Sequence, residues 1–162
     1  MLRKTAPKQG TGTIRRKRGT IGRKRRKSGE ITKLKKKLWQ LCRDIQIQKY
    51  GRTCFTCGRH DLHGGNCQLG HFITSSTCST EVRFDLKNLR PQCYHCNINL
   101  SGNWIAYECA LLLEGIDIAE LKTRNAETKG KVYGVPWFEE KITQYTLLAT
   151  QQTKPNVNGD KV

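Results

Sequence analysis

The sequence has no long hydrophobic run: nowhere does it reach the roughly 18 consecutive apolar residues that a membrane-spanning helix needs. The N-terminus also lacks the apolar stretch of about 7–15 residues that a secretory signal requires. An Arg-rich, acid-poor start can imitate a mitochondrial transit peptide, but residues 1–30 show no amphipathic stripe. We therefore expect a cytoplasmic protein whose eight cysteines are reduced thiols available to a metal, rather than disulfides.

Acidic residues are scarce at the N-terminal end of the chain. Residues 1–37 contain 16 Lys and Arg and one acid, Glu30, whereas residues 38–162 contain 14 Lys and Arg and 12 acids. The formal net charge of +17 therefore belongs to a basic tail that precedes a nearly neutral domain. A charge excess of this size points to a polyanionic partner.

The tail, residues 1–30, combines repelling charges with little apolar surface, so we expect it to be disordered. Disorder is also expected for residues 153–162. Dense Lys and Arg clusters bind phosphate backbones whatever the base sequence, which favours contact with nucleic acid. A simple solubilising tail is the alternative. The tail residues expected to contact DNA are Arg15, Arg16, Arg18, Arg25 and Arg26.

A helix is predicted directly after the tail. Apolar residues recur there at steps of three and four, and Gly51 is a plausible stop, so the helix covers residues 31–50. Four lysines crowd its start against the helix dipole, which suggests that they contact phosphate; a solvated face is the alternative. They are Lys33, Lys35, Lys36 and Lys37. The stripe consists of Ile31, Leu34, Leu38, Leu41 and Ile45.

Three further helices are predicted after a cysteine-rich middle. The first covers residues 103–114, the second begins at Asp117, which resembles an N-cap, and the third covers residues 136–152. The first of these has a predicted apolar stripe of Trp104, Ile105, Cys109, Leu112 and Leu113. The helices and the cysteine-rich middle together form one expected domain, residues 31–152.

Two Cys-x-x-Cys knuckles indicate a zinc site. Two residues between thiols let both sulfurs reach one ion, and two knuckles complete a tetrahedron. The four predicted ligands are Cys54, Cys57, Cys93 and Cys96. Because all four positions are filled by thiols, we expect one structural Zn²⁺ per chain rather than a catalytic one. Coincidence or a redox pair is the alternative.

The other four cysteines carry no metal-binding pattern. Cys42 and Cys109 lie on or beside apolar helical faces and are expected to be buried thiols. Cys67 and Cys78 flank His71 at a spacing that fits no familiar ligand pattern, so no role is assigned to them.

Between and beside the knuckles, His71, Asn88 and Asn97 occur in an order that resembles the HNH, or ββα-metal, endonucleases. Members of that family carry a His late in a first strand, an Asn in the following loop, and an Asn or His at the start of a helix. The resemblance implies a small α+β fold in which two short strands and a helix surround the active centre. Zinc would pin this core, and the other helices would flank it.

A narrower resemblance covers about residues 50–125, where the ordered motifs look like those of the NinG (Rap) recombination proteins of lambdoid phages. The motifs are Leu69-Gly70-His71-Phe72, Arg83-Phe84, Gln92-Cys93, Cys96-Asn97 and Ser101-Gly102-Asn103. This resemblance implies a metal-dependent endonuclease that cleaves branched DNA, such as Holliday junctions, in the cytoplasm of a bacterial host. A non-catalytic zinc-ribbon DNA-binding or recombination accessory protein is the alternative. An RNA-binding or ribosome-associated protein is a third class.

Phosphodiester hydrolysis gives each residue of the ordered set a role. His71 suits a general base, because imidazole titrates near neutral pH. Asn88 can hold the imidazole or its loop, and Asn97 offers an amide oxygen to Mg²⁺ or another divalent cation. A turn residue and a helix cap are their respective alternatives. The residues expected to grip phosphates near the site are Lys35, Lys36, Arg83, Lys87 and Arg90.

The sequence departs from the HNH pattern at Gly70, where that family usually has an Asp or His as a second metal ligand. Gln68, Asp61 or His63 are candidates to supply the missing ligand, or the metal rests on Asn97 and substrate phosphates alone.

A homodimer is also considered, because a two-fold assembly matches the symmetry of a four-way junction. Its interface would involve the helices at residues 31–50 and 136–152. Packing of the first helix onto the zinc core of the same chain is the alternative.

Overall fold

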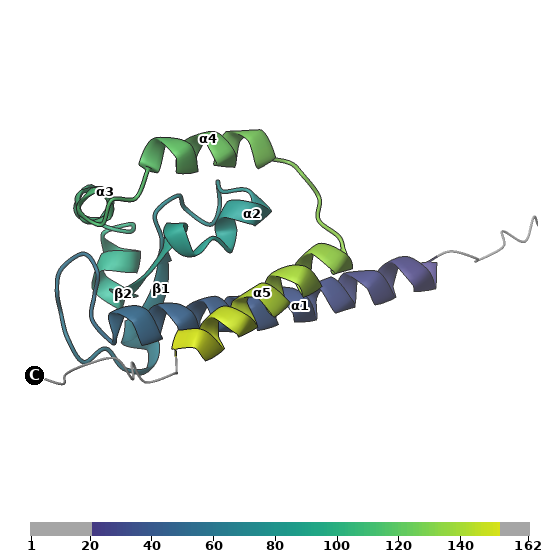
Figure 1. Cartoon of the computed structure of the whole chain (residues 1–162), viewed down its shortest axis with the longest axis horizontal. Helices are drawn as coiled ribbons and strands as arrows, with labels where there is room; N and C mark the ends of the chain where they lie inside the picture. Colours follow the sequence, from purple (N-terminus) through teal and green to yellow (C-terminus); the bar gives the residue numbers. More distant parts are fainter. Residues whose placement is uncertain (1–20, 153–162) are drawn as a thin grey trace, which may run out of the picture.

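The computed structural model describes residues 21–152, with side chains described from Gly29 to Gln151 (Figure 1). This part of the chain is mostly helical, with one two-stranded antiparallel sheet. The elements in chain order are α1 (Ile21–Tyr50), β1 (Cys67–His71), α2 (Thr80–Arg83), β2 (Leu89–Cys93), α3 (Trp104–Leu113), α4 (Ile118–Thr128) and α5 (Val135–Gln152). Short 3-10 turns cover Gly64–Asn66 and Leu86–Asn88, and a π-helical turn, η3, covers His95–Asn99.

The sheet positions the two regions that the sequence singles out. Cys67 pairs with Cys93 at one end of the sheet, and His71 pairs with Leu89 at the other. The second knuckle follows directly, because Cys93 ends β2 and Cys96 lies in η3. The cysteines and His71 therefore lie at opposite ends of one short sheet.

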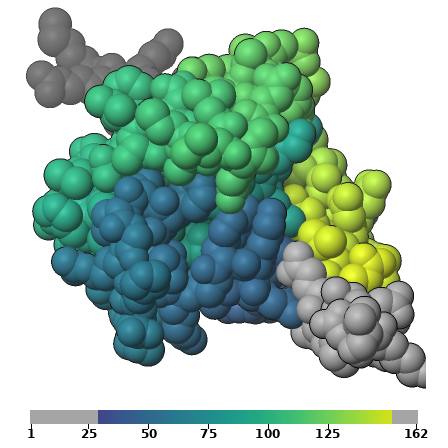
Figure 2. All heavy atoms as spheres, turned by 60° about the vertical axis from the view of Figure 1, so that its left-hand side comes forward, coloured from purple at the N-terminus to yellow at the C-terminus, as the bar shows by residue number. Residues whose placement is uncertain are grey.

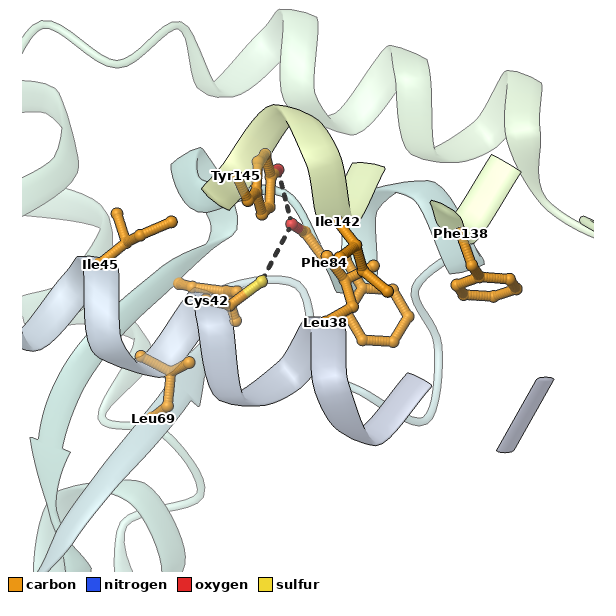
Figure 3. Packing of buried hydrophobic residues seen from close by; sticks show 9 residues of the cluster. Leu38, Cys42, Ile45, Leu69, Phe84, Phe138, Ile142 and Tyr145 are labelled. Carbon is orange, nitrogen blue, oxygen red and sulfur yellow. Dashed lines mark hydrogen bonds between the residues drawn. The ribbon is translucent and has the colours of Figure 1, made fainter. Parts of the chain in front are cut away.

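Helices α1 and α5 lie side by side and run in the same direction, from right to left in Figure 1. Their facing side chains form the largest apolar core, together with residues of β1 and of the segment before β2. Figure 3 shows this cluster, in which the Tyr145 hydroxyl and the Cys42 thiol both donate to the Phe84 carbonyl, at 2.8 and 3.6 Å. The buried members are Leu38, Cys42, Ile45, Leu69, Phe84, Leu89, Phe138, Ile142 and Tyr145.

The predicted apolar stripe of α1 packs against other parts of the same chain. Leu38 and Ile45 are buried against α5, and Ile31, Leu34 and Leu41 are partly buried against the same cluster. Packing within the chain, one of the two interpretations of this stripe, therefore accounts for it, but the partner is α5 and not the zinc core. The stop at Gly51 is also correct, since this glycine follows the helix with φ of 69° and donates its N–H to the Ile47 carbonyl.

Helix α1 begins at Ile21 rather than at residue 31, so residues 21–30, expected to be disordered, are helical in this structure. Lys and Arg are good helix formers, and extending a helix that has already formed avoids the unfavourable nucleation step. The expectation of disorder for residues 1–20 and 153–162 lies outside the described residues.

The predicted buried face of α3 is wrong. Trp104, Ile105, Leu112 and Leu113 are 58–90% exposed and Cys109 is exposed, whereas Tyr107 and Leu111 are buried. Apolar residues occur all round this short helix, so spacing alone does not select a face. In Figure 2 the α3–α4 segment, drawn in green, forms the upper surface of the molecule above the blue segment that includes the first knuckle.

The remaining helix predictions are confirmed closely. Asp117 caps α4 by accepting the Glu120 N–H at 2.9 Å, as its position before Glu120 predicts. Helix α5 begins at Val135, one residue before Pro136. Among the helices of the described residues, none is long and apolar enough to cross a bilayer.

Candidate functional site

The four knuckle cysteines come together as predicted. Their sulfur atoms all lie within 4.8 Å of one another, and Cys57 Sγ and Cys93 Sγ are 3.9 Å apart. Two sulfurs bound to one tetrahedral zinc at about 2.3 Å would lie about 3.8 Å apart. Gly58 closes the first knuckle with φ of 71° and donates its N–H to the Cys54 carbonyl, a turn that favours glycine. The donor set and its spacing therefore fit a structural zinc ion.

The four other cysteines stay outside this cluster. Cys42 is buried as expected, and burial raises the pKa of its thiol to about 12, which makes it unreactive. Cys109 is exposed, because the face of α3 that carries it points to solvent. Cys67 is buried beside the knuckles, and Cys78 lines a cavity next to α1.

His71 ends β1 and is held on two sides. Its imidazole stacks on the indole of Trp39 from α1, with ring centroids 5.1 Å apart and planes 11° apart. Nε2 lies 3.2 Å from the main-chain carbonyl of Arg83. A carbonyl only accepts, so Nε2 carries the proton and Nδ1 keeps its lone pair. Nδ1 is thus the nitrogen able to accept a proton from water.

The same surroundings keep His71 uncharged. Burial lowers the pKa of His71 to about 4; the hydrogen bond to the Arg83 carbonyl opposes this shift, and the positive charge of Arg83 adds to it. The imidazole is therefore neutral at pH 7, the form that a general base requires. The sequence did not indicate Trp39, which lies 32 positions earlier and reaches His71 only through the packing of α1 on the sheet.

Asn88 holds the long segment between the strands. Its buried amide accepts the Ile73 N–H at 2.7 Å and donates to the carbonyls of Ile73 and Val82, both at 3.1 Å. Val82 directly precedes Arg83, so these bonds place the carbonyl that orients His71. The side chain of Asn88 is fully buried, so it holds this segment in place and is not accessible from outside the protein.

Asn97 lies in η3, across from β1. Its Nδ2 donates to Gln68 Oε1 at 2.5 Å, so Gln68 already uses its oxygen inside the protein. Asp61 and His63 are exposed in the segment before β1. Within the described part of the chain, the four cysteines form the only group of three or more His, Cys, Asp or Glu residues able to hold a metal.

His71 and Asn97 open onto one cavity of about 540 Å³. A second cavity of about 420 Å³ adjoins it and shares Trp39 and Arg83 as walls. Lys35 and Lys36, from one turn of α1, line this second cavity. The arrangement brings His71, Asn97 and three cationic side chains to two cavities with shared walls.

The family model described as "Bacteriophage Lambda NinG protein" matches residues 2–153. The chain belongs to the NinG family. Protein ninG of Salmonella phage P22 is 33% identical over 76 residues, which are 47% of this chain and 36% of that protein. Protein ninG of Escherichia phage 933W is 34% identical over 59 residues, covering 36% and 28% of the two chains. The matched stretches thus span about a third of these curated relatives, and no solved structure matches.

Two of the basic residues predicted for this NinG-family chain are engaged inside the protein. Arg90 is 1% exposed, and its guanidinium donates to Glu114 at 2.5 and 3.1 Å and to the carbonyls of Leu86 and Leu89. This burial contradicts the expectation that Arg90 contacts DNA; it joins β2 to the end of α3 instead. Lys87 is half-exposed and pairs with Glu120 of α4 at 3.2 Å.

The basic residues expected in the tail are not placed. Arg15, Arg16 and Arg18 lie outside the described residues. Arg25 and Arg26 lie in α1, in a part whose side chains are not described.

Proposed function

We propose that this NinG-family protein is a metal-dependent DNA endonuclease that cleaves branched DNA, such as Holliday junctions, during phage recombination. One observation carries the proposal: a neutral His71, with Nδ1 free of hydrogen bonds to the described residues, opens onto the cavity that Asn97 shares. A buried structural histidine would have both ring nitrogens engaged.

The fold supports a ββα-metal core of the HNH type. In this proposal β1 carries the base, β2 supports the sheet, and η3 carries Asn97 where the helix of that motif would begin. The four-cysteine cluster would hold a structural zinc ion at the far end of the sheet. Its role is to fix β1 against η3, a region with few other buried side chains.

The chain's own residues have distinct tasks in hydrolysis. Nδ1 of His71 accepts a proton from the attacking water, while the Arg83 carbonyl fixes the ring through Nε2. Lys35, Lys36 and the Arg83 side chain bind phosphates on the strand beside the scissile bond. Asn97 would hold a divalent cation, which supplies charge neutralisation at the phosphate and the leaving oxygen.

The test is incubation of zinc-loaded protein with a labelled four-way junction and a matching duplex, with and without added Mg²⁺. Omitting Mg²⁺ is better than chelation, because a chelator also removes zinc. We expect Mg²⁺-dependent cleavage of the junction in preference to the duplex. His71→Ala should lower the cleavage rate by about 10²–10⁴-fold and leave junction affinity unchanged, because the base acts on water.

Binding of the junction without any Mg²⁺-dependent cleavage would identify a DNA-binding accessory protein instead. Preferential competition by RNA would point to an RNA-binding role. If His71→Ala cleaved at the wild-type rate, the HNH assignment would be wrong.

A homodimer on the junction is part of the proposal, since one active centre makes one cut and resolution needs two. The apolar stripe of α1 is already covered by α5, so the interface would lie elsewhere. Light scattering of free and junction-bound protein measures this. If the protein were a monomer and cut duplex and junction equally, it would be a general nickase and not a junction-specific enzyme.

A further inference from the structure

The space beside Gly70 is filled by oxygen atoms from two other elements. A Cβ atom built on Gly70 would lie 1.9 Å from Gln92 Oε1 of β2 and 3.1 Å from Asn97 Oδ1 of η3. Any side chain at this position would therefore collide with the Gln92 amide. Glycine is required here by close approach, and two amide oxygens converge where the HNH pattern would place a ligand.

Hydrogen bonds fix the direction of both amides. Gln92 Nε2 donates to the Gly102 carbonyl at 2.8 Å and to Thr56 Oγ1 at 3.2 Å. Because a carbonyl cannot donate, rotating the Gln92 amide by half a turn would set two acceptors against each other. Oε1 must therefore face Gly70.

Asn97 is oriented by a similar chain of donors. Gln68 Nε2 donates to the Gly65 carbonyl at 3.2 Å, which leaves Gln68 Oε1 as the acceptor for Asn97 Nδ2. Asn97 Oδ1 then faces the same side of Gly70 as Gln92 Oε1 does. Both oxygens are acceptors, and neither supplies a proton to the other.

Gln92 is completely buried, and its Oε1 has no hydrogen-bond partner among the described residues. A buried acceptor without a donor is unfavourable, and a second acceptor close by makes it more so. A cation between the two oxygens removes both problems. Amide oxygens are hard ligands of the kind that Mg²⁺, Mn²⁺ and Ca²⁺ accept.

We propose that Gln92 Oε1 and Asn97 Oδ1 are the protein ligands of a divalent cation, and that Gln92 replaces the side chain absent at residue 70. This inference rests on the proposed function, because the cation would be the one that acts in cleavage. The missing ligand would then come from Gln92 of β2, the strand that pairs with β1, and not from a position of the HNH pattern.

The test measures Mn²⁺ binding directly, by electron paramagnetic resonance of zinc-loaded protein titrated with Mn²⁺ alone. Gln92→Ala should weaken Mn²⁺ binding by about tenfold or more, since even residues that only support metal ligands contribute that much. The double variant Gly70→Asp, Gln92→Ala should regain most of the affinity. It places a carboxylate in the space that the glutamine vacates.

The two variants form a matched pair, because both lose the bonds from Gln92 Nε2 and differ only in the carboxylate. Zinc content and melting temperature establish that each is folded; should Gln92→Ala not fold, Gln92→Val, which also ends short of the space beside Gly70, takes its place in both. Unchanged Mn²⁺ affinity in the Gln92 variant would overturn the proposal. A loss that the carboxylate does not restore would also overturn it, by assigning Gln92 a packing role.

Failure of this inference and of the proposed function are distinguishable. If the junction is cleaved with Mg²⁺ but Mn²⁺ binding does not depend on Gln92, the endonuclease proposal stands and Gln92 is not a ligand. Mn²⁺ binding that depends on Gln92, without junction cleavage, leaves the metal site and removes the endonuclease.

Discussion

The first residue of β1, Cys67, and its middle residue, Leu69, belong to regions that are stabilised in different ways. Leu69 packs into the α1–α5 core, where nine buried residues with apolar side chains or thiols meet. Cys67, two residues earlier, packs into the knuckle region, where Leu62 is the one buried residue that is not a cysteine. The first region is held by apolar burial, and a zinc ion on the four cysteines would supply the stability that the few apolar side chains of the second do not. The candidate site lies where the two regions join, so its geometry depends on both.

Removing the metal should have the largest effect, and this effect should fall mainly on the knuckle region. Cys93→Ser should release zinc, and apparent zinc-binding free energies of about 10–16 kcal/mol contribute directly to folding in small zinc domains. We expect zinc near background, loss of junction cleavage, and circular dichroism that keeps part of its helical signal from α1 and α5. Cys109→Ser, which changes an exposed thiol on α3, is the control and should behave as wild type. A zinc-free Cys93→Ser protein with the wild-type melting temperature would contradict the zinc site.

Weakening the apolar core should have the next largest effect. Phe138 is 1% exposed and meets Phe84 edge-on, with ring centroids 6.0 Å apart. Phe138→Ala should lower the free energy of unfolding by about 3–5 kcal/mol, measured by urea titration, while the folded variant keeps its zinc. Leu147→Ala, at a 59% exposed position of α5, should change it by less than about 0.5 kcal/mol. Equal losses in the two variants would show that α5 does not pack as described.

The stacking of Trp39 on His71 ties the candidate site to the α1–α5 core, and its removal should appear in the pH dependence. Burial holds the pKa of His71 at about 4, so the base form persists in mildly acidic solution. Trp39→Ala exposes the ring and should raise this pKa toward the usual value of about 6.5. The fraction of neutral imidazole at about pH 5.5 would then fall roughly tenfold.

The measurement is kcat/KM for junction cleavage between pH 4 and 8, because this parameter reports the ionisation of the free enzyme. The acid-side decrease in kcat/KM should occur at lower pH for the wild type than for Trp39→Ala. The two profiles should converge above pH 7.5. Trp39→Phe retains a stacked ring and should return the limb toward the wild-type position. Identical acid limbs for wild type and Trp39→Ala would mean that the indole does not shield His71.

The smallest effect concerns the basic cavity. Lys35→Ala and Lys36→Ala should each lower the slope of log affinity against log salt concentration by about 0.9, if each lysine contacts one phosphate of duplex DNA. Lys37→Ala is the matched control, because Lys37 is exposed on the same helix and lines neither cavity of the candidate site. If Lys37→Ala changed the slope as much as Lys35→Ala and Lys36→Ala do, DNA would be attracted by the overall charge of α1 and not bound at the cavity.

Local signals made part of this structure predictable. The zinc ligands follow from spacing within two short motifs, and α4 from a capping residue and its partner. The face of α3 was not predictable. It is decided by the Tyr107 hydroxyl, which donates to the Gly70 carbonyl at 3.2 Å across 37 residues of sequence.

The same limit explains the errors at the site. Arg90 carries a charge in a segment that looks exposed, and its partner Glu114 lies 24 residues further on. Gln92 reads as an ordinary polar residue beside a knuckle, and its unpaired oxygen becomes visible only when η3 folds over β1. His71, Asn88 and Asn97 could be singled out because their order follows a family pattern, whereas the complete burial of Asn88 became visible only in the structure.

Arg83 contributes to the candidate site in two separate ways, through its main chain and through its side chain. The main chain of Arg83 orients the imidazole, while its side chain lines the cavities where a substrate would lie. A substitution at position 83 can therefore change what the protein recognises without removing the acceptor that sets the tautomer of His71. In the proposed endonuclease, specificity could therefore vary at position 83 while the orientation of His71 is preserved.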